Sequence, residues 1–121
     1  MTDTITTIPI NQLMRDCIQH CTECHNVCTE TTTYCLQQGG TYASVDLVRL
    51  LQDCAELCAT SADYMLRGSS LSARVCGLCA TVCDACAERC DPFGDDRQMK
   101  ACADTCRRCA ACCRSMASMA K

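Results

Sequence analysis

Apolar and small residues recur along most of the chain at steps of three and four residues. This is the spacing of one face of an α-helix, where positions i, i+3, i+4 and i+7 lie above one another. The pattern is clearest between Val75 and Asp91, where five cysteines follow one another at steps of three, four, three and four. No helix breaker interrupts this stretch after Gly77, and its alanines favour helix. We therefore predict one helix with a continuous stripe of cysteine along one face.

Three other stretches have the same period, and short segments rich in turn residues separate all four. The predicted helices cover about residues 10–38, 45–67, 72–90 and 96–118. Gly39 and Gly40 suit the end of the first helix. The expected N-caps of the second, third and fourth helices are Ser44, then Ser70 or Ser72, then Asp95 or Asp96.

Four helices with one apolar stripe each and short loops predict an all-α fold, the antiparallel up-down-up-down four-helix bundle. Packing turns the four stripes inward, so the core is expected to be lined with cysteine. The bundle is predicted to form a single domain over residues 9–119, with Pro9 in the first helical turn. Residues 1–8 are Thr-rich, and we expect a flexible N-terminus there.

The composition supports a core built from cysteine. The chain has 17 cysteines in 121 residues but only one Phe, three Tyr and no Trp. Free cysteine packs as a small hydrophobic residue. An odd count, a helical period and the absence of a leader-like N-terminus argue against a secreted disulfide framework. We therefore expect a cytoplasmic protein with reduced thiols.

The remaining composition excludes two other classes of protein. No apolar run reaches the length of about 18 residues that a membrane span needs. The net charge is -3 with interspersed signs, which gives no basic footprint for nucleic acid. We therefore expect neither a membrane nor a nucleic-acid partner.

The spacing of the cysteines is suited to metal binding. Cysteines four residues apart on a helix have Cβ atoms about 5–6 Å apart, so two thiolates can converge on one ion. The sequence contains seven such pairs, with C-x-x-C links between them. The candidate ligands on the stripes are Cys17, Cys21, Cys24, Cys28, Cys35, Cys54, Cys58, Cys76, Cys79, Cys83, Cys86, Cys90, Cys102, Cys106, Cys109 and Cys113. Cys112 lies about 80–100° from the centre of its stripe and is an additional candidate.

The charge balance of the core favours one metal. Soft thiolates select Cu(I), zinc or iron–sulfur clusters. A Zn²⁺ with four thiolates carries two net negative charges, and the stripes contain no Lys or Arg to offset them, although buried uncompensated charge is very unfavourable. One Cu⁺ per thiolate is neutral. We predict a multinuclear Cu(I) array, with a small zinc or iron–sulfur bundle as the alternative.

An enzymatic function is the other alternative. A cytosolic thiol oxidoreductase needs one or two accessible thiols of low pKa, whereas this pattern buries many equivalent thiols. No phosphate loop, paired carboxylates or nucleophile elbow is present. We therefore expect a protein that is not an enzyme.

Several other residues accompany the cysteine stripes. Met14, Met65 and Met116, with Met119 nearby, are expected at one end of the bundle, where thioethers can pass Cu(I) inward. Met99 is expected at the opposite end as a filler. His20 and His25 flank the first stripe, either as further ligands or as edge residues. Thr31 and Ser61 are expected to be small polar core residues that bond a backbone carbonyl.

Four segments carry a resemblance to a known family. They read C-I-Q-H-C-T-E-C-H-N-V-C from Cys17, D-C-A-E-L-C from Asp53, V-C-G-L-C-A-T-V-C-D-A-C-A-E-R-C from Val75 and A-C-A-D-T-C-R-R-C-A-A-C-C-R-S-M from Ala101. The chain resembles the bacterial cytosolic copper storage proteins. The resemblance implies a four-helix bundle that stores many Cu(I) ions, is commonly a tetramer and takes up metal at one end, with a copper chaperone as a candidate partner. Thr31, Met99 and Cys112 depart from the pattern, so the number of ions does not carry over.

Overall fold

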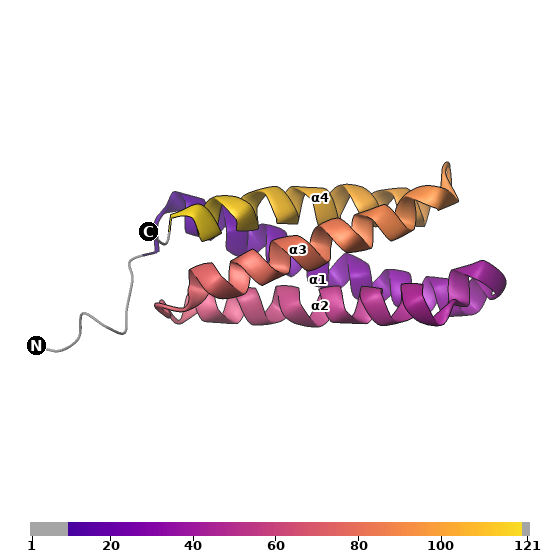
Figure 1. The fold of residues 1–121 in the computed structure, drawn as a ribbon, viewed down its shortest axis with the longest axis horizontal. Helices are drawn as coiled ribbons and strands as arrows, with labels where there is room; N and C mark the ends of the chain where they lie inside the picture. The colour runs from indigo at the N-terminus through magenta and orange to yellow at the C-terminus, as the bar shows by residue number, and fades with distance from the viewer. Residues whose placement is uncertain (1–9, 120–121) are drawn as a thin grey trace, which may run out of the picture.

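The computed structural model describes residues 10–119. Within them the chain forms four long helices and two short 3-10 turns (Figure 1). The helices are α1 (Gln12–Gln38), α2 (Val45–Leu66), α3 (Ser72–Cys90) and α4 (Arg97–Ser118), and the turns are η2 (Gly40–Ala43) and η3 (Asp91–Phe93). The flexible N-terminus predicted at residues 1–8 and the predicted role of Pro9 lie outside the described residues.

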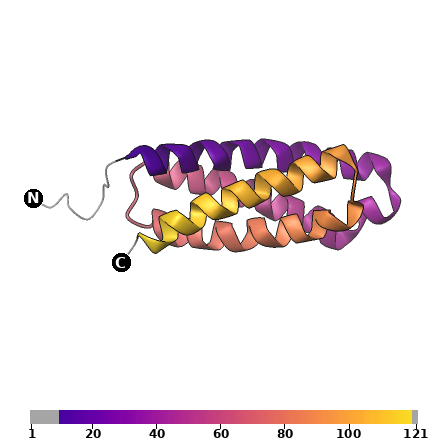
Figure 2. The same ribbon diagram turned by 90° about the horizontal axis from the view of Figure 1, so that it is seen from above.

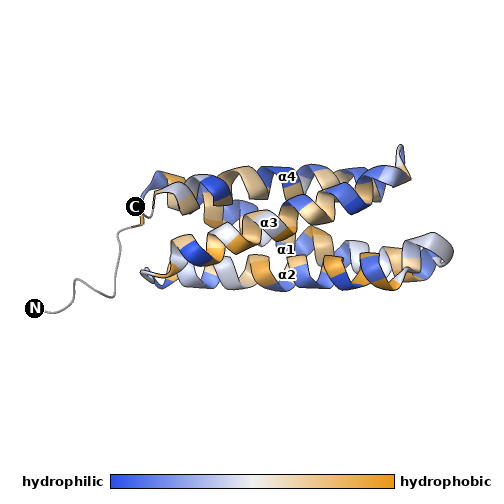
Figure 3. Ribbon diagram, viewed as in Figure 1, coloured by the Kyte–Doolittle hydropathy of each residue, from blue (hydrophilic) through white to orange (hydrophobic). Residues whose placement is uncertain are grey.

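The helices form an antiparallel four-helix bundle, as predicted. The backbone of each helix packs against its two neighbours in the ring, with α1 closing the ring against α4. The described backbones of the diagonal pairs stay apart, and only side chains such as Cys58 of α2 and Cys109 of α4 meet across the core. Figures 1 and 2 show the four helices running along one long axis. Hydrophobic and hydrophilic residues alternate along every helix (Figure 3), as expected for helices that bury one face.

Side chains cap three of the four helices. The Asn11 side chain accepts a hydrogen bond from the Met14 backbone N–H at 2.9 Å, so α1 begins two residues later than predicted. Ser44 caps α2 as predicted, and Asp96 is the residue that caps α4, through a bond from the Met99 N–H at 3.0 Å. Gly39 follows α1 with φ +72°, a backbone conformation that favours glycine.

The predicted cap of α3 is wrong. The residue at the cap position is Leu71, whose side chain cannot accept a hydrogen bond. Ser72 is instead the first helical residue, and its hydroxyl donates to the Ser69 carbonyl at 2.7 Å. Ser69 Oγ in turn accepts from the Leu71 N–H at 3.1 Å, so the turn before the helix takes the place of a conventional cap.

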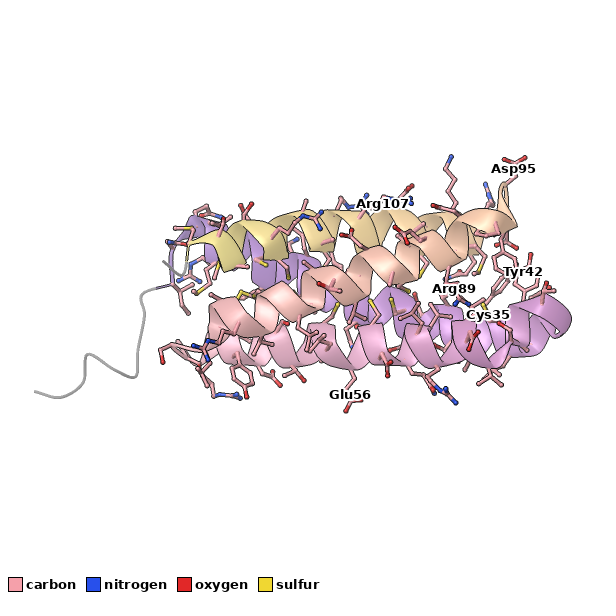
Figure 4. All side chains as sticks on the ribbon, in the orientation of Figure 1. Cys35, Tyr42, Glu56, Arg89, Asp95 and Arg107 are labelled. Atoms are coloured by element: carbon pink, nitrogen blue, oxygen red, sulfur yellow. The ribbon has the colours of Figure 1, made fainter. Side chains whose placement is uncertain are left out.

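The two ends of the bundle differ. The end where α1 and α3 begin carries Met14, Met65 and Met116, and we call it the methionine end. The opposite end carries Tyr34, Tyr42, Phe93 and Asp96, and we call it the tyrosine end. The labelled Cys35 and Tyr42 lie together at this second end in Figure 4.

Hydrogen bonds and aromatic packing close the tyrosine end. The hydroxyls of Tyr34 and Tyr42 both donate to the same Asp96 carboxylate oxygen, at 2.6 and 2.8 Å. The Tyr42 ring packs on Phe93 with centroids 4.3 Å apart and meets Tyr34 edge-on at 5.9 Å. The hydrogen bond from Tyr34 lowers the pKa of Asp96, and the same bond raises the pKa of Tyr34 to about 12. The cluster ties α1, the η2 turn, the η3 turn and the start of α4 together.

The outer surface carries many charged side chains, beside exposed apolar ones such as Leu36 and Leu78. Glu56 points away from the bundle in Figure 4. Exposed ion pairs join Arg107 to Asp91 on the α3–α4 side and Arg89 to Asp46 across α2 and α3. Such pairs add little stability individually. Of the helices that the structure describes, none combines the length and the apolar character required to traverse a bilayer.

Candidate metal centre

The cysteines lie where the helical pattern places them. All sixteen cysteines on the stripes are buried, with at most 2% of the residue exposed, whereas Cys112 is half-buried. Every one of the 17 is a free thiol. The core of the bundle is therefore a column of reduced sulfur atoms, flanked by alanine, leucine and methionine.

Sulfur atoms from different helices are in contact along this column. The Cys58 Sγ of α2 lies 3.6 Å from both Cys79 and Cys83 of α3 and 3.8 Å from Cys109 of α4. The Cys24 Sγ of α1 lies 3.7 Å from Cys106 of α4. These contacts run between helices, so the fold rather than any one sequence motif creates the ligand sets.

Five sets of cysteines have ligand atoms that all lie within 4.8 Å of one another. From the methionine end to the tyrosine end they are Cys17/Cys76/Cys113, Cys21/Cys79/Cys109/Cys113, Cys24/Cys58/Cys83/Cys109, Cys24/Cys28/Cys54/Cys106 and Cys28/Cys86/Cys102/Cys106. A metal–sulfur bond of about 2.3 Å separates two sulfurs on one ion by roughly 3.8–4.6 Å. The spacing in each set therefore suits a thiolate-bound metal ion.

Consecutive sets share ligands. Cys113 belongs to the first two sets, Cys109 to the second and third, and Cys24 to the third and fourth. Cys28 and Cys106 belong to both of the last two sets. A thiolate that is shared in this way can bridge two ions, so the sets form one continuous array along the bundle axis.

Two buried cysteines lie beyond the shared sets, near the tyrosine end. The Cys35 thiol is 3.6 Å from the Met99 thioether sulfur. Cys90 ends α3 and is 2% exposed. The Met99 thioether therefore contacts a predicted ligand at the tyrosine end of the array, whereas the sequence predicted Met99 only as a filler there.

Burial and neighbouring thiols hold protons on several of the cysteines. Burial raises the pKa of the Cys35 thiol to about 11. Hydrogen bonding with Cys109 raises the pKa of Cys58 and of Cys83, and burial raises it further. Without metal these groups are neutral thiols, which an apolar interior accommodates far better than anions.

The core offers no positive charge to balance thiolates. The buried polar residues among those described are Thr31, Thr32, Ser61, Ser72 and Thr105, with no lysine or arginine. A buried array of thiolates then requires its counter-charge from the metal itself. A monovalent ion matches one thiolate for one positive charge, which favours Cu(I) over Zn²⁺ for a continuous array.

The methionines lie at the ends of the column. Met65 Sδ is 3.8 Å from the Cys76 sulfur, which belongs to the first ligand set. Met14 and Met116 are 3% and 5% exposed at the same end, whereas Met119 is largely exposed. The thioether of Met65 is thus in direct contact with the array.

Neither histidine joins a ligand set within the described residues. His25 Nδ1 lies 2.8 Å from the Ala55 carbonyl oxygen, a bond that ties α1 to α2 at the bundle edge. His20 Nδ1 lies 3.9 Å from a Glu23 carboxylate oxygen and has no hydrogen-bond partner among the described residues. The geometry therefore favours edge roles over metal ligation.

The two small polar residues on the stripes behave differently. Thr31 donates to the Val27 carbonyl at 2.7 Å, as predicted, and accepts a bond from the Gln98 side chain at 2.9 Å. For Ser61 the predicted core position is confirmed, but the predicted bond to a backbone carbonyl is wrong. Ser61 is 0% exposed, and its hydroxyl has no hydrogen-bond partner among the described residues.

Comparison with known proteins places this geometry in context. A family model described as copper storage protein matches residues 10–118. The Nmul_A1745 protein of Nitrosospira multiformis is 42% identical, with a TM-score of 0.84, over 89% of this chain and 97% of that one.

Two further solved structures that resemble this chain are those of copper storage proteins. The Cu(I)-bound copper storage protein BsCsp3 of Bacillus subtilis is 35% identical, with a TM-score of 0.81, over 88% of this chain and 99% of its own. A cytosolic copper storage protein from Streptomyces lividans, studied with five coppers, is 28% identical, with a TM-score of 0.82, over 88% and 93% of the two chains.

Proposed function

The chain belongs to the copper storage protein family, and from that premise we propose that it stores Cu(I) as a row of thiolate-bound ions inside the bundle. The observation that carries the proposal is the run of five ligand sets, each of which shares at least one cysteine with the next along the bundle axis. Because neighbouring ions can share a bridging thiolate, many ions can be held close together along the core. The Cu(I)-bound relative with the same fold supports the choice of metal.

Binding of each ion replaces a thiol proton with Cu⁺, and the proton leaves to solvent. The oxidation state of copper does not change, and the core stays neutral because one positive charge leaves for each one that arrives. The cysteines already fill the core as thiols, so the bundle folds before metal binds, unlike a zinc finger. Metal ions are therefore added to a bundle that is already folded.

We assign the sixteen buried cysteines as the main ligands and the half-buried Cys112 as an outer one. Hydrogen bonding with Cys17 raises the pKa of Cys112, and burial raises it further. Since Cys17 belongs to the first ligand set, Cys112 extends the array toward the surface. Met14, Met65 and Met116 complete the proposed site as neutral, soft donors at the same end.

Copper is proposed to enter at the methionine end. There Met65 touches Cys76 of the first ligand set, and Cys112 offers a partly accessible thiol. The tyrosine end is covered by Tyr34 and Tyr42, which both donate a hydrogen bond to Asp96, and by the ring of Phe93. An incoming ion therefore meets soft donors at one end and a hydrogen-bonded aromatic cluster at the other.

Catalysis is not part of the proposal. An oxidoreductase needs an accessible thiol of low pKa, but the most accessible cysteine, Cys112, has a raised pKa. A cytosolic location is proposed by analogy with the Streptomyces lividans relative, which is described as cytosolic. A tetramer and delivery by a copper chaperone follow from the family resemblance alone and stay predictions.

Anaerobic titration of the reduced apoprotein with Cu(I) and, separately, with Zn(II) tests the function. With 17 free thiols available, storage predicts tight binding of more than about ten Cu(I) per chain, because soft thiolates favour Cu(I). It also predicts few zinc ions and little change in helical circular dichroism. Saturation at one or two Cu(I), or a zinc capacity equal to that for Cu(I), would contradict the proposal.

A further inference from the structure

Ser61 interrupts the cysteine stripe of α2. This helix contributes only Cys54 and Cys58, whereas each of the other three helices carries five cysteines. Ser61 lies three residues after Cys58 and four before Met65, so all three side chains share one helical face. A hydroxyl therefore occupies the place where the repeat would put the next sulfur.

Sulfur atoms from α3 border this position on both sides. Cys58 lies 3.6 Å from Cys79, and Met65 lies 3.8 Å from Cys76. Ser61 sits between Cys58 and Met65 on α2, so it faces the stretch of α3 from Cys76 to Cys79. That stretch supplies ligands to the first two sets, nearest the methionine end.

The Ser61 hydroxyl lacks the partner that its chemistry requires. It is fully buried, and no donor or acceptor among the described residues bonds it. Thr31, at the matching kind of position on α1, has both a carbonyl and an amide partner. A buried hydroxyl without a hydrogen bond is unfavourable, and native structures contain few of them. A hydrogen-bond acceptor that is present only when metal is bound would account for the unpartnered Ser61 hydroxyl.

We propose that Ser61 is a positioning residue of the copper array, and that its hydroxyl donates a hydrogen bond to a copper-bound thiolate of Cys58, Cys76 or Cys79. A protonated thiol is only a weak acceptor, whereas a thiolate is a charged one. The acceptor therefore forms when Cu⁺ replaces the thiol proton. An alcohol oxygen is too hard to be a good Cu(I) ligand itself, so donation to sulfur is the role that fits.

Such a bond would hold one thiolate in place and tune the copper that it binds. Hydrogen bonds to ligand sulfur orient the ligand and favour the more reduced state of the metal. The inference rests on the proposed storage function, since it needs thiolates that carry copper. It adds that part of the Cu(I) affinity near the methionine end comes from a residue that is not a ligand.

The test compares Ser61→Ala with wild type in the apo form and in the Cu(I)-loaded form. The apo melting temperature should stay the same or rise, because the variant removes an unpartnered hydroxyl. In the loaded form, competition with a Cu(I) chelator should show one class of ions held about tenfold more weakly, the typical effect of a lost hydrogen bond to a charged group. Thr31→Val is the matched control, and it should lower the melting temperature of both forms alike.

Two further variants separate position from chemistry. Ser61→Thr keeps the hydroxyl and should restore the wild-type competition curve. Ser61→Cys places a thiol of similar size at the same point and should bind about one more Cu(I) than wild type. Equal behaviour of Ser61→Ala and wild type toward the chelator, or an equal shift in the apo and loaded forms, would overturn the inference. Failure of the wild-type protein to bind many Cu(I) would instead refute the storage function.

Discussion

Replacement of Cys58 by alanine tests the central claim that one buried array both fills the core and holds the metal. The Cys58 sulfur is 0% exposed and touches Cys79, Cys83 and Cys109 on two other helices. It is also a member of the third ligand set, in the middle of the column. Its removal should therefore weaken the apo bundle slightly and the loaded bundle much more.

The two effects can be sized separately. Loss of a buried group of methylene size removes about 0.8 kcal/mol of burial, and the small residual cavity adds a few tenths of a kcal/mol. The apo form should thus lose about 1 kcal/mol. A binding site held at 100 times its Kd contributes about 2.7 kcal/mol, so the loaded form should lose about 4 kcal/mol in total.

Anaerobic guanidinium denaturation of both forms, with free Cu(I) set by a chelator buffer, measures these values. Cys112→Ala is the comparison, because it removes a thiol that is half-buried and outside the five sets. It should change apo stability by less than about 0.5 kcal/mol and leave the tightly held ions in place. The reasoning fails if Cys58→Ala retains the wild-type number of tightly held ions, or if its loss is the same with and without copper.

Three further variants probe the ends of the bundle. Leucine at Met14, Met65 and Met116 together should slow Cu(I) uptake several-fold in stopped-flow measurements and leave capacity unchanged; unchanged rates would rule out the proposed route. Asp96→Ala removes a helix cap and should lower stability by about 1–2 kcal/mol without loss of copper sites. Because folding lowers the pKa of Asp96 from its ordinary 3.8, this residue stabilises the fold above that value, and the difference between variant and wild type should shrink as the pH falls below it. Gly94→Ala should destabilise by about 1–3 kcal/mol in thermal melts, because Gly94 has φ +58° and ψ −114°, a conformation that residues with a Cβ rarely adopt.

The fold was predictable because its signal is periodic. The cysteines of α3 repeat at helical steps without interruption, and Gly39, Ser44 and Asp96 mark helix ends by well-understood local chemistry. The cap of α3 was not predictable in the same way. Leu71 occupies that position because the turn bonds made by Ser69 and Ser72 replace a side-chain cap, and no cap signal in the sequence marks that substitution.

The sequence predicted which cysteines line the core, but not which of them come together in sets. Steps of three and four place Cys24 and Cys28 on one face, and the structure has their sulfurs 3.9 Å apart. The partnership of Cys24 with Cys106 depends on how far α1 and α4 are displaced along the axis, which is a property of the packed bundle. The sequence also does not show that the Ser61 hydroxyl lacks a hydrogen-bond partner. A serine in a helix can bond the carbonyl four residues earlier, but Ser61 does not do so in the packed bundle.

The cluster of Tyr34, Tyr42 and Asp96 has a kinetic consequence for the store as a whole. If copper enters and leaves only at the methionine end, the ions leave the array in the reverse of the order in which they entered. The first to arrive move deepest, beside Cys35 and Met99, and they leave last. A nearly empty bundle would then release its copper more slowly per ion than a full one, so the rate of supply would itself report how much metal the cell has in reserve.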